Sequence, residues 1–195
     1  MDSVNNWLFG YINATATSPD WLIGLALFFA KWLIFIIPIM LVASWLWGRD
    51  RRFLFNVVMS LVIAFLLSKL IGELYYYSRP FAQGIGHQYL SHAKDASFPS
   101  DHGIGAFTFA LAFIYFGARK TGLFLLACAV AIAWSRVYLG VHWPLDMVGA
   151  FIVAMVSCVI AKQINLLVGA KILSPIESVY RLCFSPFIRR GWVKY

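Results

Sequence analysis

Charged residues are scarce in this chain: they make up 12% of its 195 residues, and only eight are Asp or Glu. A typical soluble domain carries about twice that fraction of charge. Hydrophobic residues reach 62%, and the mean hydropathy is +0.78. The shortage of charge therefore excludes an ordinary soluble domain and predicts an integral membrane protein.

Other features that define whole classes of protein are also missing. The apolar runs do not alternate with polar residues, which excludes a transmembrane β-barrel. The three cysteines show no disulfide or metal-ligand spacing. No basic segment precedes the first apolar stretch, so we expect the first spanning helix, not a cleavable signal peptide, to direct insertion.

Long apolar runs predict an all-α, polytopic membrane helical bundle of about five transmembrane helices. The runs cover about residues 21–47, 53–77, 100–116, 122–138 and 145–168. A shorter apolar and aromatic stretch, 4–12, predicts an N-terminal interfacial helix. We expect a membrane-embedded domain over residues 1–170 and a basic, aromatic tail over residues 171–195, either lying on the anionic inner leaflet or disordered.

Most Lys and Arg residues fall in the connectors at one end of the predicted helices and in the tail. They are Arg49, Arg51, Arg52, Arg119, Lys120, Lys171, Arg181, Arg189, Arg190 and Lys194. A net charge of +8 would also suit nucleic acid, but these residues form no single basic face, so we expect no nucleic-acid partner. The positive-inside rule places this end and the C-terminus in the cytoplasm, with the N-terminus outside.

Three short polar segments lie at the opposite, non-cytoplasmic ends of the runs. They are Arg79-Pro80, Pro99-Ser100-Asp101-His102, and Ser135-Arg136 followed by His142 and Asp146. Because the topology places all three on one side, a single site can be built from them. Arginine forks, imidazoles and a carboxylate are the groups that phosphoryl transfer without a metal would need.

The spacing of His142 and Asp146 lets the carboxylate reach one imidazole nitrogen and fix the tautomer. The other nitrogen would be free to attack phosphorus, although a purely structural hydrogen bond has the same spacing. Ser100 or Asp101 could cap the third spanning helix, whose free N–H groups suit an anion. Capping alone leaves His102 unexplained.

Arg79 and Arg136 offer planar forks that match phosphate oxygens. Contacts with lipid headgroups are the alternative for both. Two further histidines, His87 and His92, lie in the loop before Pro99; we interpret them as solvated, rather than as gating residues or metal ligands.

Together these segments resemble the three signature motifs of the type 2 phosphatidic acid phosphatase superfamily, over about residues 69–146. The resemblance implies a helical bundle in which His142 is the nucleophile and forms a phosphohistidine, Asp146 orients it, and His102 protonates the leaving group. It implies neither a metal nor another cofactor. The phosphoryl oxygens would be held by Arg79, Ser100 and Arg136.

Two positions depart from the family pattern. Gly72 stands where the family usually has Lys, and Lys69 is the nearest substitute, either binding phosphate or pairing with Glu73. Asp101 replaces the usual Gly and should disfavour an anion unless its carboxylate points away or caps the helix. The Pro-Ser-Asp-His form resembles bacterial undecaprenyl pyrophosphate phosphatases of the bacitracin-resistance type, which makes Asp101 a candidate for substrate tuning.

This second resemblance implies hydrolysis of a polyprenyl diphosphate, undecaprenyl pyrophosphate, to its monophosphate on the outer face of a bacterial inner membrane. That reaction recycles the cell-wall carrier lipid. Phosphatidic acid, phosphatidylglycerol phosphate and lipid A phosphate are alternative substrates. A lipid-phosphate transporter or flippase is the alternative of another class, favoured by Lys31 and Lys69 inside predicted spans. The sequence predicts no oligomeric state.

Overall fold

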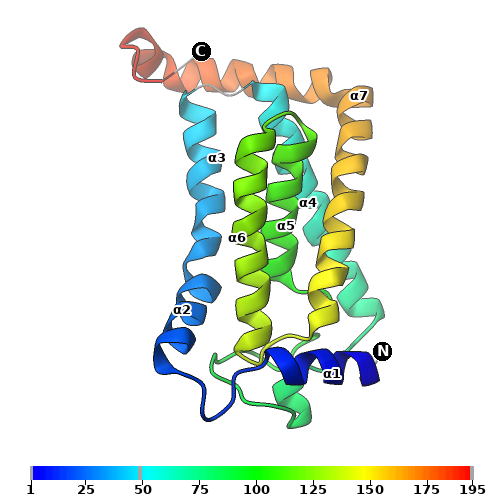
Figure 1. The fold of residues 1–195 in the computed structure, drawn as a ribbon. Helices are drawn as coiled ribbons and strands as arrows, with labels where there is room; N and C mark the ends of the chain where they lie inside the picture. The colour runs from blue at the N-terminus through cyan, green and yellow to red at the C-terminus, as the bar shows by residue number, and fades with distance from the viewer. Residues whose placement is uncertain (1, 48–49, 194–195) are drawn as a thin grey trace.

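The computed structural model describes residues 2–47 and 50–193, and all regular structure in this part is helical. Figure 1 shows upright helices side by side, with α1 lying across one end and the last part of α7 across the other. The elements are α1 (Asp2–Ile12), α2 (Asp20–Lys31), η1 (Leu33–Phe35), α3 (Ile36–Trp47), α4 (Arg51–Leu74), η2 (Pro80–Gln83), α5 (Asp101–Tyr115), α6 (Arg119–Tyr138) and α7 (Pro144–Arg189).

Four helical stretches in the described part are long and apolar enough to cross a membrane. They are Asp20–Trp47, Arg51–Leu74, Arg119–Tyr138 and Pro144–Arg189. The remaining predicted span, α5, has 15 residues, fewer than the roughly 20 that a lipid-exposed span needs. Ten of those residues are buried, because α5 stands in the middle of the bundle. The prediction of an all-α membrane bundle is confirmed.

The first span differs from the single helix predicted for residues 21–47. It consists of α2, the 3-10 turn η1 and α3, with Lys31 exposed at the break. Pro38 lies in the first turn of α3, where its missing N–H removes no helical hydrogen bond. Only 11% of this span is buried, against 44% to 50% for the other three. The first span is therefore a peripheral wall of the bundle.

Helix α7 continues past the predicted end of the last span at residue 168. Figure 1 shows its first part running along the bundle and its last part crossing the bundle end. Tyr180 is buried there, with the Arg51 guanidinium 4.1 Å from its ring centroid and the Trp45 ring 5.5 Å away. Of the two alternatives for the tail, disorder is therefore wrong for residues 171–189. The domain division at residue 170 stays a prediction.

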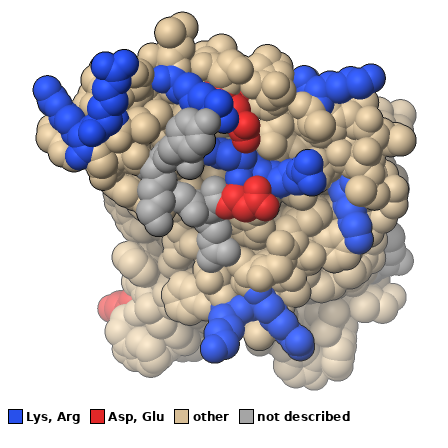
Figure 2. Space-filling model, turned by 90° about the horizontal axis from the view of Figure 1, so that it is seen from above, with Lys and Arg blue, Asp and Glu red and all other residues tan. Residues whose placement is uncertain are grey.

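Basic side chains gather at this end of the bundle, as Figure 2 shows. They come from the start of α4, the start of α6 and the last part of α7: Arg51, Arg52, Arg119, Lys120, Arg181, Arg189 and Arg190. Arg49 and Lys194 lie outside the described residues. The three polar segments lie at the opposite end. The basic residues and the polar segments are therefore at separate ends of the bundle, as predicted.

At the polar end, α1 and the loops are tied together by side-chain hydrogen bonds. Asn13 donates to His87 O and Tyr138 O, both at 3.0 Å, and accepts from the His87 N–H at 2.8 Å. Gly140 has a φ of +78°, and a Cβ there would clash with His87 O. The loop therefore packs against the end of α6 as closely as a glycine allows.

Candidate active site

The turn between α6 and α7 positions His142 and Asp146. Pro144 occupies the first turn of α7, and the Trp143 N–H donates to Asp146 Oδ2 at 2.8 Å. The Asp146 carboxylate therefore caps the start of α7 and lies beside His142. The turn is held from below by α1, whose Phe9 ring lies 5.1 Å from the Trp143 ring.

His142 faces two oxygen acceptors with one ring nitrogen. Its Nδ1 lies 3.1 Å from Asp146 Oδ2 and 3.1 Å from Ser97 O. Because neither oxygen can donate when the carboxylate is ionised, the hydrogen belongs on Nδ1 and the lone pair on Nε2. The predicted contact between carboxylate and imidazole is present.

Burial and the positive charge of Arg79 lower the pKa of His142 well below its usual range. The ring is 1% exposed. At neutral pH it is therefore uncharged, which is the form whose Nε2 lone pair can attack phosphorus.

Arg79 is buried and bonded on every side of its guanidinium. Nε donates to Asp95 Oδ1 at 2.8 Å, and Nη2 donates to Ala96 O at 3.2 Å. Nη1 donates to Val141 O at 2.9 Å and lies 2.9 Å from His142 Nε2. Since this last contact engages the lone pair of Nε2, Arg79 must shift before that nitrogen can attack.

Arg136 lies in the last turn of α6 and is as buried as Arg79, but it is bonded differently. Its Nε and Nη2 have no hydrogen-bond partner in the described part of the chain. A buried guanidinium edge without a partner is costly and attracts an anion. This edge fits the predicted contact with phosphoryl oxygens.

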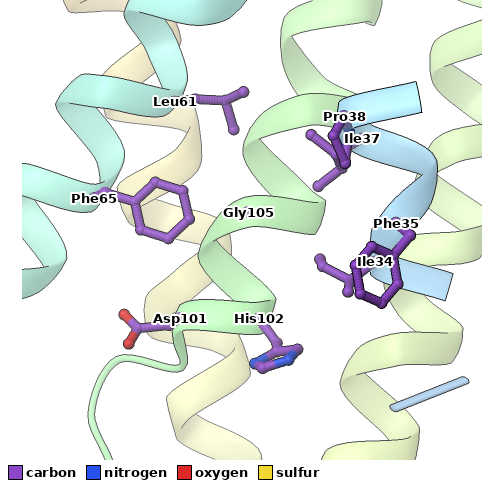
Figure 3. Close-up of a pocket in the computed structure, with 9 residues that line it drawn as sticks. All are labelled: Ile34, Phe35, Ile37, Pro38, Leu61, Phe65, Asp101, His102 and Gly105. Atoms are coloured by element: carbon purple, nitrogen blue, oxygen red, sulfur yellow. The ribbon is translucent and has the colours of Figure 1, made fainter. Parts of the chain in front are cut away.

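The start of α5 carries the second polar segment. Ser100 is the N-cap, as predicted, and its Oγ accepts from the Gly103 N–H at 3.3 Å. Asp101 Oδ1 accepts from Ser68 Oγ at 2.9 Å, so this carboxylate bonds to α4. Figure 3 shows Asp101 and His102 on opposite sides of the start of α5. His102 also lines the apolar groove described below.

Comparison with known proteins agrees with this arrangement. Residues 21–168 match the model of the PAP2 superfamily, most of the chain. The chain belongs to the PAP2 superfamily. It is 45% identical to YbjG of Escherichia coli (strain K12) over 196 residues, which cover 100% of this chain and 99% of YbjG. It is 30% identical to the undecaprenyl-diphosphatase BcrC of Bacillus subtilis (strain 168) over 155 residues, covering 78% and 80%.

A solved structure also matches. The crystal structure of Aquifex aeolicus LpxE aligns with a TM-score of 0.66 at 20% identity, covering 82% of this chain and 95% of that one. This likeness concerns the fold. Together with the apolar helices, it makes the chain a multi-pass membrane protein, and both resemblances drawn from the motifs are confirmed.

Lys69, the candidate for the missing PAP2 lysine, lies apart from the histidines. It lines a cavity of about 500 Å³ together with Glu73, Asp95 and Asp101. Among the described residues, no ion pair joins Lys69 to Glu73, and no hydrogen bond joins it to His142. The structure therefore does not bring Lys69 into the cluster around His142, and its phosphate-binding role stays a prediction.

The motifs did not reveal three loop residues that complete the site. The Ser97 hydroxyl donates to Asp146 Oδ2 at 2.5 Å, and Asp95 forms the ion pair with Arg79. The His92 ring lies 5.9 Å from the His142 ring. Ser97 stands next to the Pro-Ser-Asp-His segment, which is a weak signal, but nothing in the spacing marks Asp95 or His92.

An apolar groove opens beside His102, between the first span and helices α4 and α5 (Figure 3). It has a volume of about 340 Å³ and is walled by Ile34, Phe35, Ile37, Pro38, Leu61 and Phe65. Gly105 lies in its floor, and Asp101 and His102 lie at its end. An apolar groove that ends at a polar site suits an amphiphile with an anionic head.

Within residues 2–47 and 50–193, no group of three or more His, Cys, Asp or Glu side chains has the geometry to hold a metal ion.

Proposed function

We propose that this PAP2 protein is a lipid diphosphate phosphatase that hydrolyses undecaprenyl pyrophosphate to undecaprenyl phosphate and inorganic phosphate. One observation carries the proposal: a buried His142 has its Nδ1 held by Asp146 and lies in a cluster with two buried arginines. The similarity to BcrC supports the choice of substrate.

In the proposed reaction, His142 Nε2 attacks the terminal phosphorus while the bond from phosphorus to the bridging oxygen breaks. His102 gives a proton to the departing lipid phosphate, and the terminal group remains on His142 as a phosphohistidine. Water then attacks this phosphorus and gives a proton to His102, the P–N bond breaks, and inorganic phosphate leaves. Arg79, Ser100 and Arg136 would offset the charge that develops on the phosphoryl oxygens.

The groove beside His102 would hold the first part of the polyprenyl tail. Its walls are almost entirely apolar, and it lies against the weakly packed first span. A hydrocarbon chain in the groove would stay in contact with the surrounding lipid while the diphosphate reached His142 and the two arginines. This placement supports a membrane lipid as substrate rather than a water-soluble phosphate ester.

The polar end would face outward from a bacterial inner membrane, and the basic end would face the cytoplasm. The N-terminus would then lie outside and the C-terminus inside. In this orientation the last part of α7, with Arg181 and Arg189 exposed, would lie along the inner leaflet as the tail of the proposed domain 1–170. We propose no oligomeric state.

Phosphate release from purified protein in detergent tests the proposed function. The substrates to compare are undecaprenyl pyrophosphate, phosphatidic acid, phosphatidylglycerol phosphate and a lipid A phosphate. We expect undecaprenyl pyrophosphate to give the highest kcat/KM. A clear preference for a glycerolipid would contradict the substrate, and no release from any of the four would contradict the phosphatase.

A further inference from the structure

His92 lies at the edge of the site, although its position in a long loop predicted a solvated side chain. Its ring meets the His142 ring edge-on, with centroids 5.9 Å apart and planes at 76°. The side chain is 22% exposed. His87, in the same loop, is exposed. The two loop histidines therefore have different environments, and only His92 borders the nucleophile.

One ring nitrogen of His92 is already occupied. Nδ1 lies 3.2 Å from Ala93 O and 3.7 Å from Asp95 Oδ1, which are both acceptors. The hydrogen of the neutral ring therefore belongs on Nδ1, and Nε2 holds a lone pair. Burial and the charge of Arg79 lower the pKa of His92, so the ring is neutral in the absence of an anion. A phosphate beside it would favour the protonated ring, which donates from both nitrogens.

The neighbours of His92 show where such a phosphate would lie. The His92 ring lies against the His142 ring, and His102 is near enough for a charge on His92 to lower its pKa. In the proposed reaction the terminal phosphorus lies at His142, and the bridging oxygen faces the proton donor His102. The second phosphate of a diphosphate is attached to that oxygen. A residue that borders His142 and lies within electrostatic range of His102 is therefore placed to reach the second phosphate.

We propose that His92 binds the second, lipid-linked phosphate and thereby makes the site selective for diphosphates over monophosphates. This inference rests on the proposed phosphatase function. The two arginines can hold the terminal phosphate of either class, but only a diphosphate offers an anion to His92. Asp95 assists by holding the hydrogen-bearing side of the ring at the rim of the site.

The test compares farnesyl diphosphate with farnesyl monophosphate, whose tails are identical. In the His92→Ala and His92→Gln proteins we expect kcat/KM for the diphosphate to fall at least tenfold and for the monophosphate to change less than twofold. His92→Lys, which keeps a positive charge, should restore most of the preference for the diphosphate. His87→Ala is the matched control and should leave both values unchanged.

Other results would overturn the inference. Equal losses on both substrates would mean that His92 only supports the His142 ring. Unchanged values in His92→Ala would mean a solvated histidine with no part in binding. Phosphate release by the wild type from both substrates would separate these failures from a failure of the proposed function, which would appear as no release from either.

Discussion

Charged side chains are buried at the polar end of the bundle and exposed at the basic end. At the polar end Arg79, Arg136 and Asp146 are at most 4% exposed. At the basic end Arg52 and Arg119 are exposed. Burying a charge costs several kcal/mol unless partners compensate it, whereas an exposed charge costs little. We therefore expect the polar end to carry the chemistry and the basic end to orient the protein in the membrane.

Within the polar end, the two arginines differ as well. Arg79 donates to a carboxylate and to two backbone carbonyls, while Arg136 leaves Nε and Nη2 without partners. Arg79 is thus part of the fold as well as of the site. The unpaired edge of Arg136 is therefore expected to bind an anion that the protein does not itself supply.

Replacing each arginine with leucine should separate these roles and give the largest effects. Arg136→Leu should lower kcat/KM by about 10³-fold, because it removes a preorganised donor to the transferred phosphoryl group. It should also leave the Tm unchanged or raised, since a buried, partly unpaired charge is lost. Arg79→Leu should cost similar activity but lower the Tm, because it breaks the ion pair with Asp95 and leaves the Ala96 and Val141 carbonyls without their donor. Thermal unfolding in detergent, with phosphate release, measures both.

An equal fall in Tm for Arg136→Leu and Arg79→Leu would contradict this difference between the two arginines. Arg136 would then be a structural residue with partners of its own.

Asp146→Asn should slow phosphate release by about 10²-fold, by analogy with tautomer control in hydrolytic triads. The amide can no longer hold the hydrogen on Nδ1 of His142 as a carboxylate does. KM should change little, because Asp146 does not touch the substrate. Asp20→Asn, at the start of α2, is the matched control. Undiminished kcat in the Asp146 protein would reject the orienting role.

Gly105→Leu should reduce kcat/KM for undecaprenyl pyrophosphate about tenfold, because the branched leucine side chain would fill space that the tail needs. A Cβ at this position would lie 3.4 Å from Phe65 and 3.7 Å from Ile37, so the groove narrows without a clash. Hydrolysis of dimethylallyl diphosphate, whose tail is short, should stay within about twofold. Gly24→Leu in α2, with no atom within 4 Å of its Cβ, should affect neither substrate.

Equal losses on the long and the short substrate would show that the groove does not hold the tail.

The smallest effect should come from the basic end. Arg119→Gln with Lys120→Gln removes two exposed charges at the start of α6, far along the bundle from His142. Phosphate release in detergent should change by less than about twofold, as is usual for surface substitutions. A tenfold loss would mean that the two ends are coupled.

The features that the sequence predicted best are those that depend on residues close together in the chain. Apolar runs longer than a bilayer specify upright helices, and the spacing of His142 and Asp146 is a property of one turn and the helix start that follows it. Ser100 was identifiable as a cap because capping is local. These features needed no knowledge of which helices pack together.

What the sequence did not reveal depends on contacts between distant residues. The loop before Pro99 follows a path set by bonds such as Ser97 N–H to Tyr77 O and Tyr89 N–H to Leu139 O. His92, Asp95 and Ser97 reach the site only because of that path. The continuation of α7 likewise depends on packing of Tyr180 against Arg51, which lies at the start of a different helix.

The most direct test of the account is to trap the phosphoryl group on His142. Undecaprenyl pyrophosphate labelled with ³²P on its terminal phosphate would be mixed with the protein and quenched within milliseconds in base, where phosphohistidine survives. We predict label on one peptide, with phosphorus on Nε2 of His142, and none in the His142→Ala protein, which should still insert and fold. Label on another residue, or rapid phosphate release by His142→Ala, would contradict the account.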